Sequence, residues 1–376
     1  MAALNRREWL RTSSLAAFGL GLTLPSMANE EGITRNFGSD TSLINLGSNE
    51  NPYGISPLAR KAIVDMFPDA NRYQFNVPSI RSFREPLANH FGLSANQILI
   101  TAGSGEALSL LARHFSKGNI VLATPTFGIL GNSAKKLDTK LIEVPLTEEK
   151  VHDLPAMMRA INDQTQLVYI VNPANPTGTI VPTETLRNFC IEAAKKTVVL
   201  IDEAYVDFLD DSRNASMMGL LRDQPNIVIV RTFSKIHGMA GLRVGFVAGH
   251  PSLIQKLEEN YFSSTQYTVS NLTIAAALAS LGDKEHARSS REKNAAAREF
   301  TQNTLRELGQ LYIPSSTNFI FFKLKNYSGD FARAMLAKNI VLRSSSYPDG
   351  KWCRVSIGTM QEMQQFAKVI KTDIRL

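Results

Sequence analysis

The sequence predicts an α/β protein in which a large three-layer αβα domain surrounds a mostly parallel sheet and a smaller α+β domain follows. From about residue 95, short runs rich in valine and isoleucine alternate with helical patterns, which is typical of a doubly covered parallel sheet. Over 284–310 the pattern becomes polar, alanine-rich and helical, and shorter strands and helices follow it. A chain of 376 residues, 44% hydrophobic and 20% charged, is long enough to bury a core in both domains.

The first 28 residues have the layout of a cleavable export signal. Arg6, Arg7 and Arg11 precede an apolar segment from Leu15 to Leu24, and small residues follow it. The paired arginines resemble a twin-arginine signal, and the apolar segment is too short to anchor the chain stably in a membrane. We therefore expect export of the folded protein to the periplasm. An amphipathic helix and a cytoplasmic location are the alternative.

The rest of the chain is expected to form an N-terminal arm and two domains. An N-terminal arm, or part of the small domain, is predicted over 29–65, the large domain over 66–283 and the C-terminal small domain over 284–376. Within the arm, the stretch NLGSNENPYGISP over 45–57 is predicted to be irregular, because asparagine, glycine and proline favour turns.

The strands of the large domain are predicted at short apolar runs, and helices at periodic segments between them. The strand-like runs are 97–103, 119–125, 140–146, 166–173, 197–205, 226–235 and 242–249, and helical patterns cover 105–115 and 183–196. In the small domain, strands are predicted over 318–324, 340–344 and 352–358, with helices over 331–339 and at the C-terminus.

Composition argues against two classes of function. The net charge is +7, but no block of lysine and arginine with interleaved aromatic residues occurs, so nucleic-acid binding is not predicted. The two cysteines, Cys190 and Cys353, are far apart and lack CxxC or histidine-rich spacing. A single disulfide between them stays open, whereas a disulfide framework and a metal site are not predicted.

Ligands of open α/β sheets bind at the carboxyl ends of the strands, and several predicted strands end in polar residues. The first such end reads TAGSGEALSLL, where a strand runs into Ser104 and Gly105 at the start of a helix. Free N–H groups at such a helix start suit an anion such as a phosphate. Ordinary helix capping explains the same residues equally well.

Two further strand ends carry polar side chains. Asn175, in VNPANPTGT, offers an amide that can donate to a phenolate or carboxylate, although proline and glycine also make ordinary turns. Asp202 ends the very apolar strand of LIDEAYVDF. Its carboxylate is expected to be partly buried and in need of a positive partner, with a helix cap as the alternative.

The fourth strand end, RTFSKIHGMAGLRVGF over 231–246, carries a lysine. Lys235 follows an apolar strand with the hydroxyls of Thr232 and Ser234 nearby, and Arg243 comes after two glycines. A lysine in such surroundings is activated as a nucleophile for a carbonyl, and a lysine that points to solvent is the alternative.

Together these residues match what pyridoxal phosphate requires: a lysine for its aldehyde, an acid for its pyridinium nitrogen and an anion site for its phosphate. The NPANPTG, DEAY and SK…GLRVGF elements resemble those of the fold-type I pyridoxal-phosphate aminotransferases. Within that group they are most similar to the histidinol-phosphate aminotransferases. The resemblance covers nearly everything from about residue 43 to the C-terminus.

The resemblance implies a transaminase with a ping-pong mechanism. An amino group passes between an amino acid, or an amino-alcohol phosphate such as histidinol phosphate, and a 2-oxo acid. The catalytic residues it implies are Lys235, Asp202 and Tyr205. Lys235 forms the Schiff base and moves the substrate proton, Asp202 pairs with the pyridinium nitrogen, and Asn175 and Tyr205 hydrogen-bond the phenolic oxygen.

Other roles also follow from the resemblance. It assigns the phosphate to Ser104, Gly105, Thr232, Ser234 and Arg243, the ring face to Phe127, and a further cofactor contact to Glu106. Tyr73 is similar to the family tyrosine that reaches the phosphate from the neighbouring subunit, which implies a homodimer. Arg354 is assigned to the substrate's carboxylate or phosphate, with Arg343 and Tyr53 in the same pocket.

The sequence also departs from the family. An aspartate is usual where this chain has Gly105, a small residue and an aromatic where it has Ile236 and His237, and a proline with a glycine-containing run where it reads QFNVPSIRSF. These changes leave the cofactor chemistry intact and the substrate open, and a structural role for His237 is favoured over a substrate contact. An exported enzyme would seldom meet histidinol phosphate, which belongs to a cytoplasmic pathway. A pyridoxal-phosphate oxidase or decarboxylase, and a non-catalytic pyridoxal-phosphate-binding protein, are the alternative functions.

Overall fold

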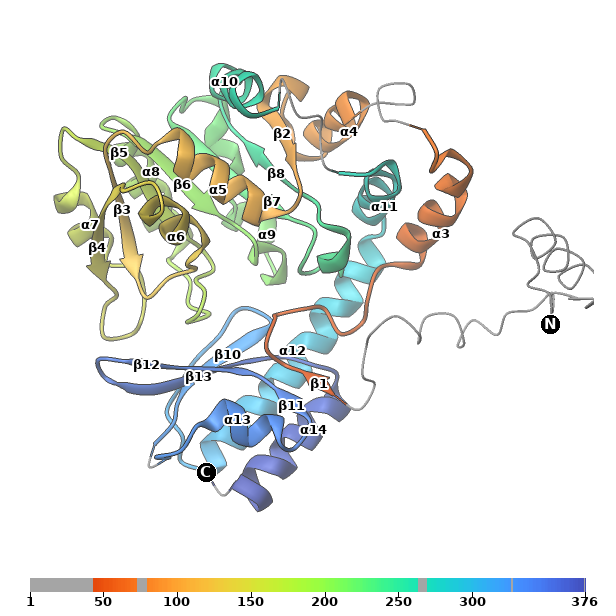
Figure 1. Cartoon of the computed structure of the whole chain (residues 1–376), viewed down its shortest axis with the longest axis vertical. Coiled ribbons are helices and arrows are strands. Elements are labelled where there is room, and N and C mark those ends of the chain that lie inside the picture. The colour runs from red at the N-terminus through yellow and green to blue at the C-terminus, as the bar shows by residue number, and fades with distance from the viewer. Residues whose placement is uncertain (1–42, 73–79, 263–268, 326, 375) are drawn as a thin grey trace, which may run out of the picture. The chain divides into compact units, whose positions relative to one another are not determined.

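The computed structural model describes residues 43–72, 80–262, 269–325, 327–374 and 376, with 80–82 described by their backbone (Figure 1). The chain from Ile44 to Leu376 forms one compact unit. The predicted signal over 1–28 and Tyr73 lie outside the described residues, so both stay predictions. Within the described ranges, no helix is both long and apolar enough to cross a membrane.

A seven-stranded sheet is built from the apolar runs that the sequence predicts as strands. Its order is β2-β8-β7-β6-β5-β3-β4, in which β3 to β7 run parallel and β8 is antiparallel to both β2 and β7. The strands are β2 (Ile98–Thr101), β3 (Asn119–Thr124), β4 (Lys140–Pro145), β5 (Thr165–Val171), β6 (Val198–Asp202), β7 (Ile227–Thr232) and β8 (Gly245–Ala248). The central strands are buried on both faces, which explains their continuous apolar runs and confirms the predicted α/β class.

Helices cover both faces of this sheet (Figure 1). On one face lie α4 (Ile80–Phe91), α7 (Leu154–Ala160), α8 (Thr183–Ala194), the 3-10 turn η4 (Met217–Arg222) and α11 (Asn271–Gly282), and on the other α5 (Ser104–His114), α6 (Ile129–Lys135) and α10 (Pro251–Tyr261). Successive strand residues serve opposite cores, because side chains alternate along a strand. Ile98 and Ile100 pack into the first core and Leu99 into the second.

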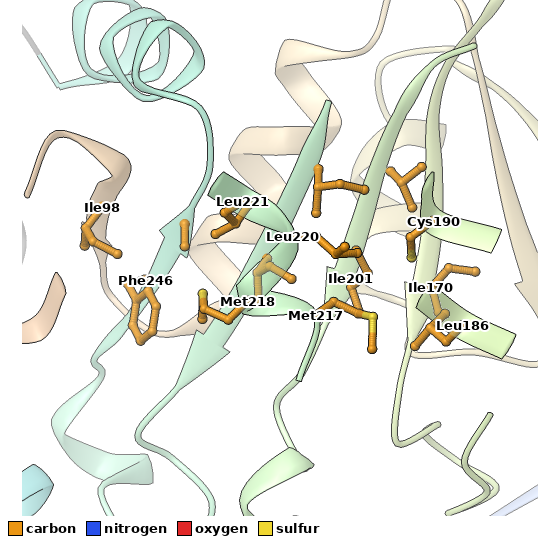
Figure 2. Close-up of a cluster of buried hydrophobic side chains, with 14 of the residues drawn as sticks. Ile98, Ile170, Leu186, Cys190, Ile201, Met217, Met218, Leu220, Leu221 and Phe246 are labelled. Carbon is orange, nitrogen blue, oxygen red and sulfur yellow. The ribbon is translucent and has the colours of Figure 1, made fainter. Parts of the chain in front are cut away.

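Figure 2 shows part of the first core, with Ile98, Ile170, Ile201 and Phe246 of the sheet and Leu186, Cys190 and Met217 of its cover. Cys190 is fully buried here, and burial raises the pKa of its thiol to about 12. Cys353 is buried in a different core. Both thiols are free, so the disulfide that the sequence left open does not form.

The C-terminal part is a second, smaller layer of strands and helices. The long helix α12 (Lys284–Glu307) leads to a four-stranded antiparallel sheet of order β12-β13-β10-β9. Its elements are β9 (Tyr312–Ile313), β10 (Phe319–Lys323), β12 (Arg343–Tyr347), β13 (Gly350–Ser356), α13 (Phe331–Leu336), α14 (Met360–Lys368) and the π-helix η6 (Val369–Ile374). The predicted small α+β layer is confirmed. The predicted domain boundary at 283/284 falls between α11 and α12 and stays a prediction.

The beginning of the described chain joins this smaller layer. β1 (Ile44–Asn45) pairs in parallel with β11 (Ile340–Val341). The run 340–344, predicted as one strand, is therefore two: β11 pairs with β1 and β12 pairs with β13. After β1 the chain is irregular, as predicted, until α3 (Pro57–Met66), which Ser56 caps by accepting the Ala59 N–H.

The remaining described elements are short. They are η1 (Phe67–Asp69), η2 (Ala95–Gln97), η3 (Val206–Phe208), α9 (Ser212–Ala215) and η5 (Ala240–Leu242).

Candidate active site

Asp202 lies at the carboxyl end of β6, where the parallel strands of the large sheet present their polar ends. Its side chain is 1% exposed. Tyr169 Oη donates to Oδ2 over 3.2 Å, and the Ala204 N–H donates to Oδ1 over 3.1 Å. Burial raises the pKa of Asp202 to about 6, against these hydrogen bonds and the charge of Lys235. Such a carboxylate gains most from a cation brought to it.

The neighbouring acid, Glu203, is already neutralised. Arg231, from the adjacent strand β7, pairs with Glu203 over 3.0 Å and with Asp207 over 2.9 Å. Ser216 and the Met217 N–H also donate to the Glu203 carboxylate. Of the two acids in the DEAY motif, Asp202 is therefore the one whose charge is left for a ligand.

Lys235 follows β7 and reaches toward the arm. Its Nζ donates to the backbone carbonyls of Ser48 and Asn49, each over 3.2 Å, and lies 5.6 Å from the centre of the Tyr205 ring. The ammonium is thus held by neutral carbonyl oxygens, which a lysine leaves more readily than a buried carboxylate. This placement suits an amine that must form and break a covalent bond.

The Tyr205 hydroxyl is the meeting point of two amides. Asn175 Nδ2 donates to it over 3.2 Å and Asn49 Nδ2 over 2.9 Å. The ring packs edge-on against Phe319, with centroids 5.1 Å apart. Asn175 and Tyr205, predicted to share one oxygen of a ligand, are brought into direct contact.

Asn49 is a site residue that the sequence reasoning missed. It is buried at φ +53, a left-handed conformation that asparagine tolerates. Its N–H donates to Ser356 Oγ over 2.8 Å, and that hydroxyl donates to Asn49 Oδ1 over 2.8 Å. The asparagines and glycine of the stretch over 45–57 signalled a turn but not its partners, which come from distant strands.

Arg354, on β13, connects the arm with the loop after β5 that carries Asn175. We call this loop, residues 172–182, the asparagine loop. Its Nη1 donates to Asn175 Oδ1 and its Nη2 to Gly47 O, both over 2.8 Å, and its guanidinium carbon lies 5.6 Å from the Phe319 ring centre. Burial lowers the pKa of Arg354. Its Nε is buried without a hydrogen-bond partner, so the guanidinium retains capacity for an anionic ligand.

Arg354 opens onto a cavity of about 300 Å³. Phe127, Asn132, Asn175, Phe321, Arg343, Tyr347, Trp352 and Arg354 are among its lining residues. Phe321 is stacked on Trp352 with centroids 4.6 Å apart, and Tyr347 meets Phe321 edge-on at 5.6 Å. Arg343 and Arg354 face each other across the β12–β13 register. The cavity therefore combines two cations with an aromatic wall.

The predicted pocket residues do not all meet there. Arg343, Arg354 and Phe127 line this cavity. Tyr53 lines another one of about 510 Å³, where His286 is also found and Lys293 lies 5.0 Å over the tyrosine ring. Burial raises the pKa of Tyr53.

The start of α5 forms a cradle with Arg243. Gly103, at φ +83, precedes the helix, and a Cβ there would lie 2.5 Å from Arg243 Nη2, so glycine is required for this approach. Arg243 itself is left-handed at φ +55. Its Nη2 donates to Ala102 O over 3.2 Å, and its Nη1 approaches Ser234 Oγ at 3.5 Å. A cation therefore stands beside the free N–H groups of a helix start.

The smaller cradle residues occupy the positions expected of them, with one difference. Thr232 Oγ1 donates to Ser234 Oγ over 2.9 Å, which brings both hydroxyls to the Arg243 side of β7. Ser104 and Gly105 form the first turn of α5. Glu106 turns back instead, and its carboxylate accepts the Ala102 N–H over 2.6 Å. Its observed contact is with the backbone of the turn before the helix.

These residues fit pyridoxal phosphate by the chemistry of the donor set. The amine of Lys235 suits an aldehyde, the buried carboxylate of Asp202 a pyridinium nitrogen, and Tyr205 with its two amides a phenolic oxygen. The cradle of Ser104 and Arg243 suits a dianionic phosphate. In the part of the chain that the structure describes, no group of three or more histidine, cysteine, aspartate or glutamate side chains is placed to hold a metal.

His237, next to the lysine in sequence, points elsewhere. Its Nδ1 shares a 2.7 Å hydrogen bond with Ser280 Oγ of α11. It lines a cavity between α4 and α12, together with Ile236. Burial lowers the pKa of His237 to about 4, so the ring is neutral at pH 7. These contacts support the structural role favoured from the sequence.

Comparisons with known proteins give consistent matches. A family model described as aminotransferase class I and II matches residues 41–370. The chain is 36% identical over 344 residues to the histidinol-phosphate aminotransferase of Brevibacillus brevis, which covers 90% of this chain and 92% of that protein. It is 33% identical over 380 residues to the Geobacillus thermodenitrificans protein of the same name, covering 98% of each.

A solved structure matches the fold over most of its length. The histidinol-phosphate aminotransferase of Sinorhizobium meliloti, in complex with pyridoxal-5'-phosphate, superposes with a TM-score of 0.80 at 24% identity. The match covers 94% of this chain and 99% of that one. At that identity the likeness concerns the fold.

Proposed function

The chain belongs to the class I and II aminotransferases, within the histidinol-phosphate aminotransferase family, and on this premise we propose how its own residues carry out amino transfer. It is a pyridoxal-phosphate-dependent aminotransferase. When bound, the cofactor accepts the electron pair that remains on the substrate carbon after a proton is removed. The protein supplies binding, orientation and proton movement.

Lys235 would hold the aldehyde of the cofactor and, with the substrate's amino group in its place, would take the proton from the substrate Cα. Its Nζ lies among the carbonyl oxygens of Ser48 and Asn49, which can accept hydrogen bonds from either the ammonium or the free amine. That environment supports an amine that works as a base in one half-reaction and as an acid in the other.

Asp202, Tyr205 and Arg243 orient the cofactor. The carboxylate of Asp202 would pair with the pyridinium nitrogen and keep it protonated, because burial makes the unpaired carboxylate costly. The Tyr205 hydroxyl and Asn175 Nδ2 donate to the phenolic oxygen. Arg243 and the start of α5 would hold the phosphate.

The substrate class proposed is an amino-alcohol phosphate, with a 2-oxo acid as acceptor. Histidinol phosphate serves as the test donor, and an exported enzyme would act on another member of this class. One observation carries this proposal: Arg354 bonds Asn175, and Asn175 bonds Tyr205, so an anion site and the cofactor face share one side chain. Arg343 adds a second cation to the same cavity. The wall of Phe321 and Trp352 suits a flat ring such as imidazole.

A donor and acceptor screen tests the proposal. Purified protein with bound pyridoxal phosphate is mixed with a panel of amino acids, histidinol and histidinol phosphate, and the change in cofactor absorbance is followed while oxygen uptake is monitored. We expect transfer from histidinol phosphate to 2-oxoglutarate, no oxygen uptake, and loss of transfer in Lys235→Ala. A protein that transfers no amino group from any donor would overturn the proposal.

Arg354→Gln separates the phosphate contact from the amino-transfer chemistry. We expect kcat/KM for histidinol phosphate to fall about 30- to 100-fold, because one charged partner of the phosphate is lost. Histidinol, which lacks the phosphate, serves as the matched substrate, and its kcat/KM is expected to change much less. Equal losses for the two donors would contradict the assignment of Arg354 to the phosphate.

We also propose a homodimer in which Tyr73 reaches the partner's site. The apolar side chains of Leu58, Val64 and Phe67 support it, since they are 50%, 61% and 60% exposed on and just after α3, a few residues before Tyr73. Mixing Lys235→Ala chains with Tyr73→Phe chains tests it. If Tyr73 acts across the interface, each mixed dimer regains one intact site and total activity approaches about a quarter of wild type at random pairing. No recovery above the two parents would contradict it.

Export through the twin-arginine route is proposed from residues 1–28. The support is the order of paired arginines, apolar segment and small residues. Fractionation of cells that carry Arg6→Lys/Arg7→Lys is expected to leave the protein in the cytoplasm, while the unchanged chain is found outside it. A doubly substituted chain that still leaves the cytoplasm would rule out this route.

A further inference from the structure

Lys150 is not among the residues that line the catalytic cavity. It contacts the turn of the β12–β13 hairpin, which carries Trp352 of the cavity's aromatic wall. Its Nζ pairs with Asp349 Oδ2 over 2.8 Å, and Asp349 lies in the tight turn between β12 and β13. Trp352 Nε1 donates to the other oxygen of Asp349 over 3.1 Å. The same Lys150 Nζ lies 5.5 Å from the centre of the Trp352 ring. One ammonium therefore contacts both the tryptophan and the carboxylate that holds it.

The backbone of Lys150 is fixed to the loop that carries Asn175. Thr179 Oγ1 donates to the Lys150 carbonyl over 2.8 Å, and the Thr179 carbonyl accepts the Ala174 N–H over 2.8 Å. Lys150 also stands at φ +62, a left-handed conformation that glycine and asparagine adopt more readily. Holding a long charged residue in this conformation costs backbone conformational energy.

Two bridges thus reach the β12–β13 hairpin. One comes from the asparagine loop after β5. The other comes from the segment between β4 and α7, which Thr179 ties to that loop. The inner bridge is Asn175 to Arg354, inside the cavity, and it involves the group proposed to bind the substrate's anion. The outer bridge is Lys150 to Asp349, at the rim, with the two side chains 24% and 41% exposed. An incoming anion competes for Arg354 and leaves the outer bridge untouched.

The outer bridge contains an ionised carboxylate. Burial raises the pKa of Asp349, but the hydrogen bonds from Lys150 and Trp352 outweigh it and hold that pKa below its ordinary value. The carboxylate is therefore ionised at pH 7. Lys323, on β10, lies 6.0 Å from the Trp352 ring and adds a second cation beside it.

We propose that Lys150 is a positioning residue for substrate binding: through Asp349 it holds Trp352 and the hairpin bearing Arg354 against the asparagine loop. This inference rests on the proposed function of the cavity and names a residue of the large layer that acts on it without touching substrate. Loss of the Lys150–Asp349 pair should leave the cofactor residues in place and make Trp352 more mobile. It should therefore weaken substrate binding more than it slows the chemistry.

The test uses the full chain in a Trp9→Phe background, which leaves Trp352 as the single tryptophan of the two in the sequence. The variants are Lys150→Met, Asp349→Asn, their combination and Lys150→Arg. Two quantities are measured: steady-state KM and kcat with histidinol phosphate, and acrylamide quenching of Trp352 fluorescence without substrate. Thermal midpoints show that each variant is folded.

We expect KM to rise about three- to tenfold in either single variant, with kcat changed less than about twofold. Trp352 should become more accessible to acrylamide. The combined variant should be no worse than either single one, because both remove the same pair, and Lys150→Arg should stay close to wild type. Lys135→Met is the matched control, since its 3.0 Å pair with Glu143 lies within the large sheet layer.

The outcomes separate this inference from the proposed function. If the wild type transfers no amino group, the proposed function fails, and the quenching series alone then decides whether Lys150 holds Trp352. Unchanged quenching in Lys150→Met and Asp349→Asn overturns the inference. So does an unchanged KM in an active enzyme, an additive double variant, or an effect of Lys135→Met as large as that of Lys150→Met.

Discussion

Asp202 ends β6 with a carboxylate that is buried, donated to by Tyr169, and left without an ion pair to any described residue. Its pKa is about 6 in the folded chain, against an ordinary value of 3.8. Between those pH values the folded state holds a proton that the unfolded state has released. In the cofactor-free protein, the contribution of Asp202 to stability therefore falls as pH rises through this window.

Asp202→Asn tests the role of this carboxylate in amino transfer and its effect on stability. Amino transfer should fall about 10²- to 10³-fold, because the charge that stabilises the cofactor nitrogen is removed. Cofactor-free Asp202→Asn should gain stability relative to wild type as pH rises from 4 to 7, by up to about 3 kcal/mol. Urea unfolding at the two pH values measures the difference. A pH-independent difference would contradict the assigned burial cost.

His237 has the opposite dependence on pH. Its pKa, lowered to about 4 by burial, lies below the ordinary 6.5, so the unfolded chain binds the proton first as pH falls. Stability should be lost between pH 6.5 and 4, and His237→Phe should remove that loss, which amounts to about 3 kcal/mol. At pH 7.5 the same variant should cost about 1 kcal/mol through the Ser280 hydrogen bond.

Activity distinguishes His237 from a substrate ligand. Because its ring bonds Ser280 and lines the α4–α12 cavity, kcat/KM of His237→Phe should stay within about threefold of wild type. A loss of 100-fold or more with an unchanged thermal midpoint would place the ring at the substrate after all.

At the scale of elements, the irregular segment between β1 and α3, residues 46–56, contacts the loop after β7 that carries Lys235. We call the two segments the strap and the lysine loop. Asn51 Nδ2 donates to Ile236 O over 2.8 Å, and the carbonyls of Ser48 and Asn49 receive Lys235. The closest approach is at Gly238, at φ +67, where a Cβ would stand 2.0 Å from Gly54 O. Backbone meets backbone there, so neither side can yield by turning a side chain.

Gly238→Ala should therefore displace the strap from the lysine loop. We expect a loss of about 2–3 kcal/mol in unfolding free energy and a drop in retained pyridoxal phosphate, since both strain and the Lys235 contacts are affected. Gly241→Ala is the matched control three residues on, where φ is not left-handed and no atom lies within 4 Å of the added Cβ. Equal effects of the two substitutions would contradict this account.

The contacts of the strap could not be predicted from the sequence, whereas other parts of the site could. Asp202, Asn175 and Lys235 could be predicted because each closes an apolar run, and the ends of neighbouring parallel strands meet at one edge. Asn49 and Ser356 could not, because their meeting depends on how the arm crosses two layers, which no local pattern encodes. Glu106 and Tyr53 were assigned by resemblance alone. In the structure Glu106 accepts the Ala102 N–H and Tyr53 lines a different cavity from Arg354, and their ligand roles stay predictions.

For the whole molecule, the exposed apolar residues at α3 make an oligomer test direct. Val64→Glu/Phe67→Glu places two charges on side chains that are 61% and 60% exposed, so the isolated chain should keep its fold. If this surface is buried in a homodimer, sedimentation should show monomers and cofactor retention should fall. Leu336→Glu, on the exposed side of α13 at 51%, is the control. A double variant that sediments as wild type would exclude this surface.

The architecture as a whole followed from pattern more reliably than the small layer did. The central strands are buried on both faces and so appear as unbroken apolar runs. Six of the seven predicted runs of the large sheet contain the strand that formed, and β5 begins one residue before its run. The run over 340–344 was predicted as one strand and is two, because β11 pairs with a strand almost 300 residues earlier in the chain. Pairing over such distances is decided by packing, not by composition.

The bond between Asn49 and Ser356 has a consequence for how the protein is made. The two residues are 307 positions apart, so the arm emerges from the ribosome when most of the chain is still to be translated. The seven-stranded sheet can close once β8 has emerged, whereas the amide pair on Tyr205 waits for β13. We therefore expect cofactor capture to be a late, post-translational event, since a chain released before β13 would carry the phosphate cradle without the Ser356 contact that holds Asn49.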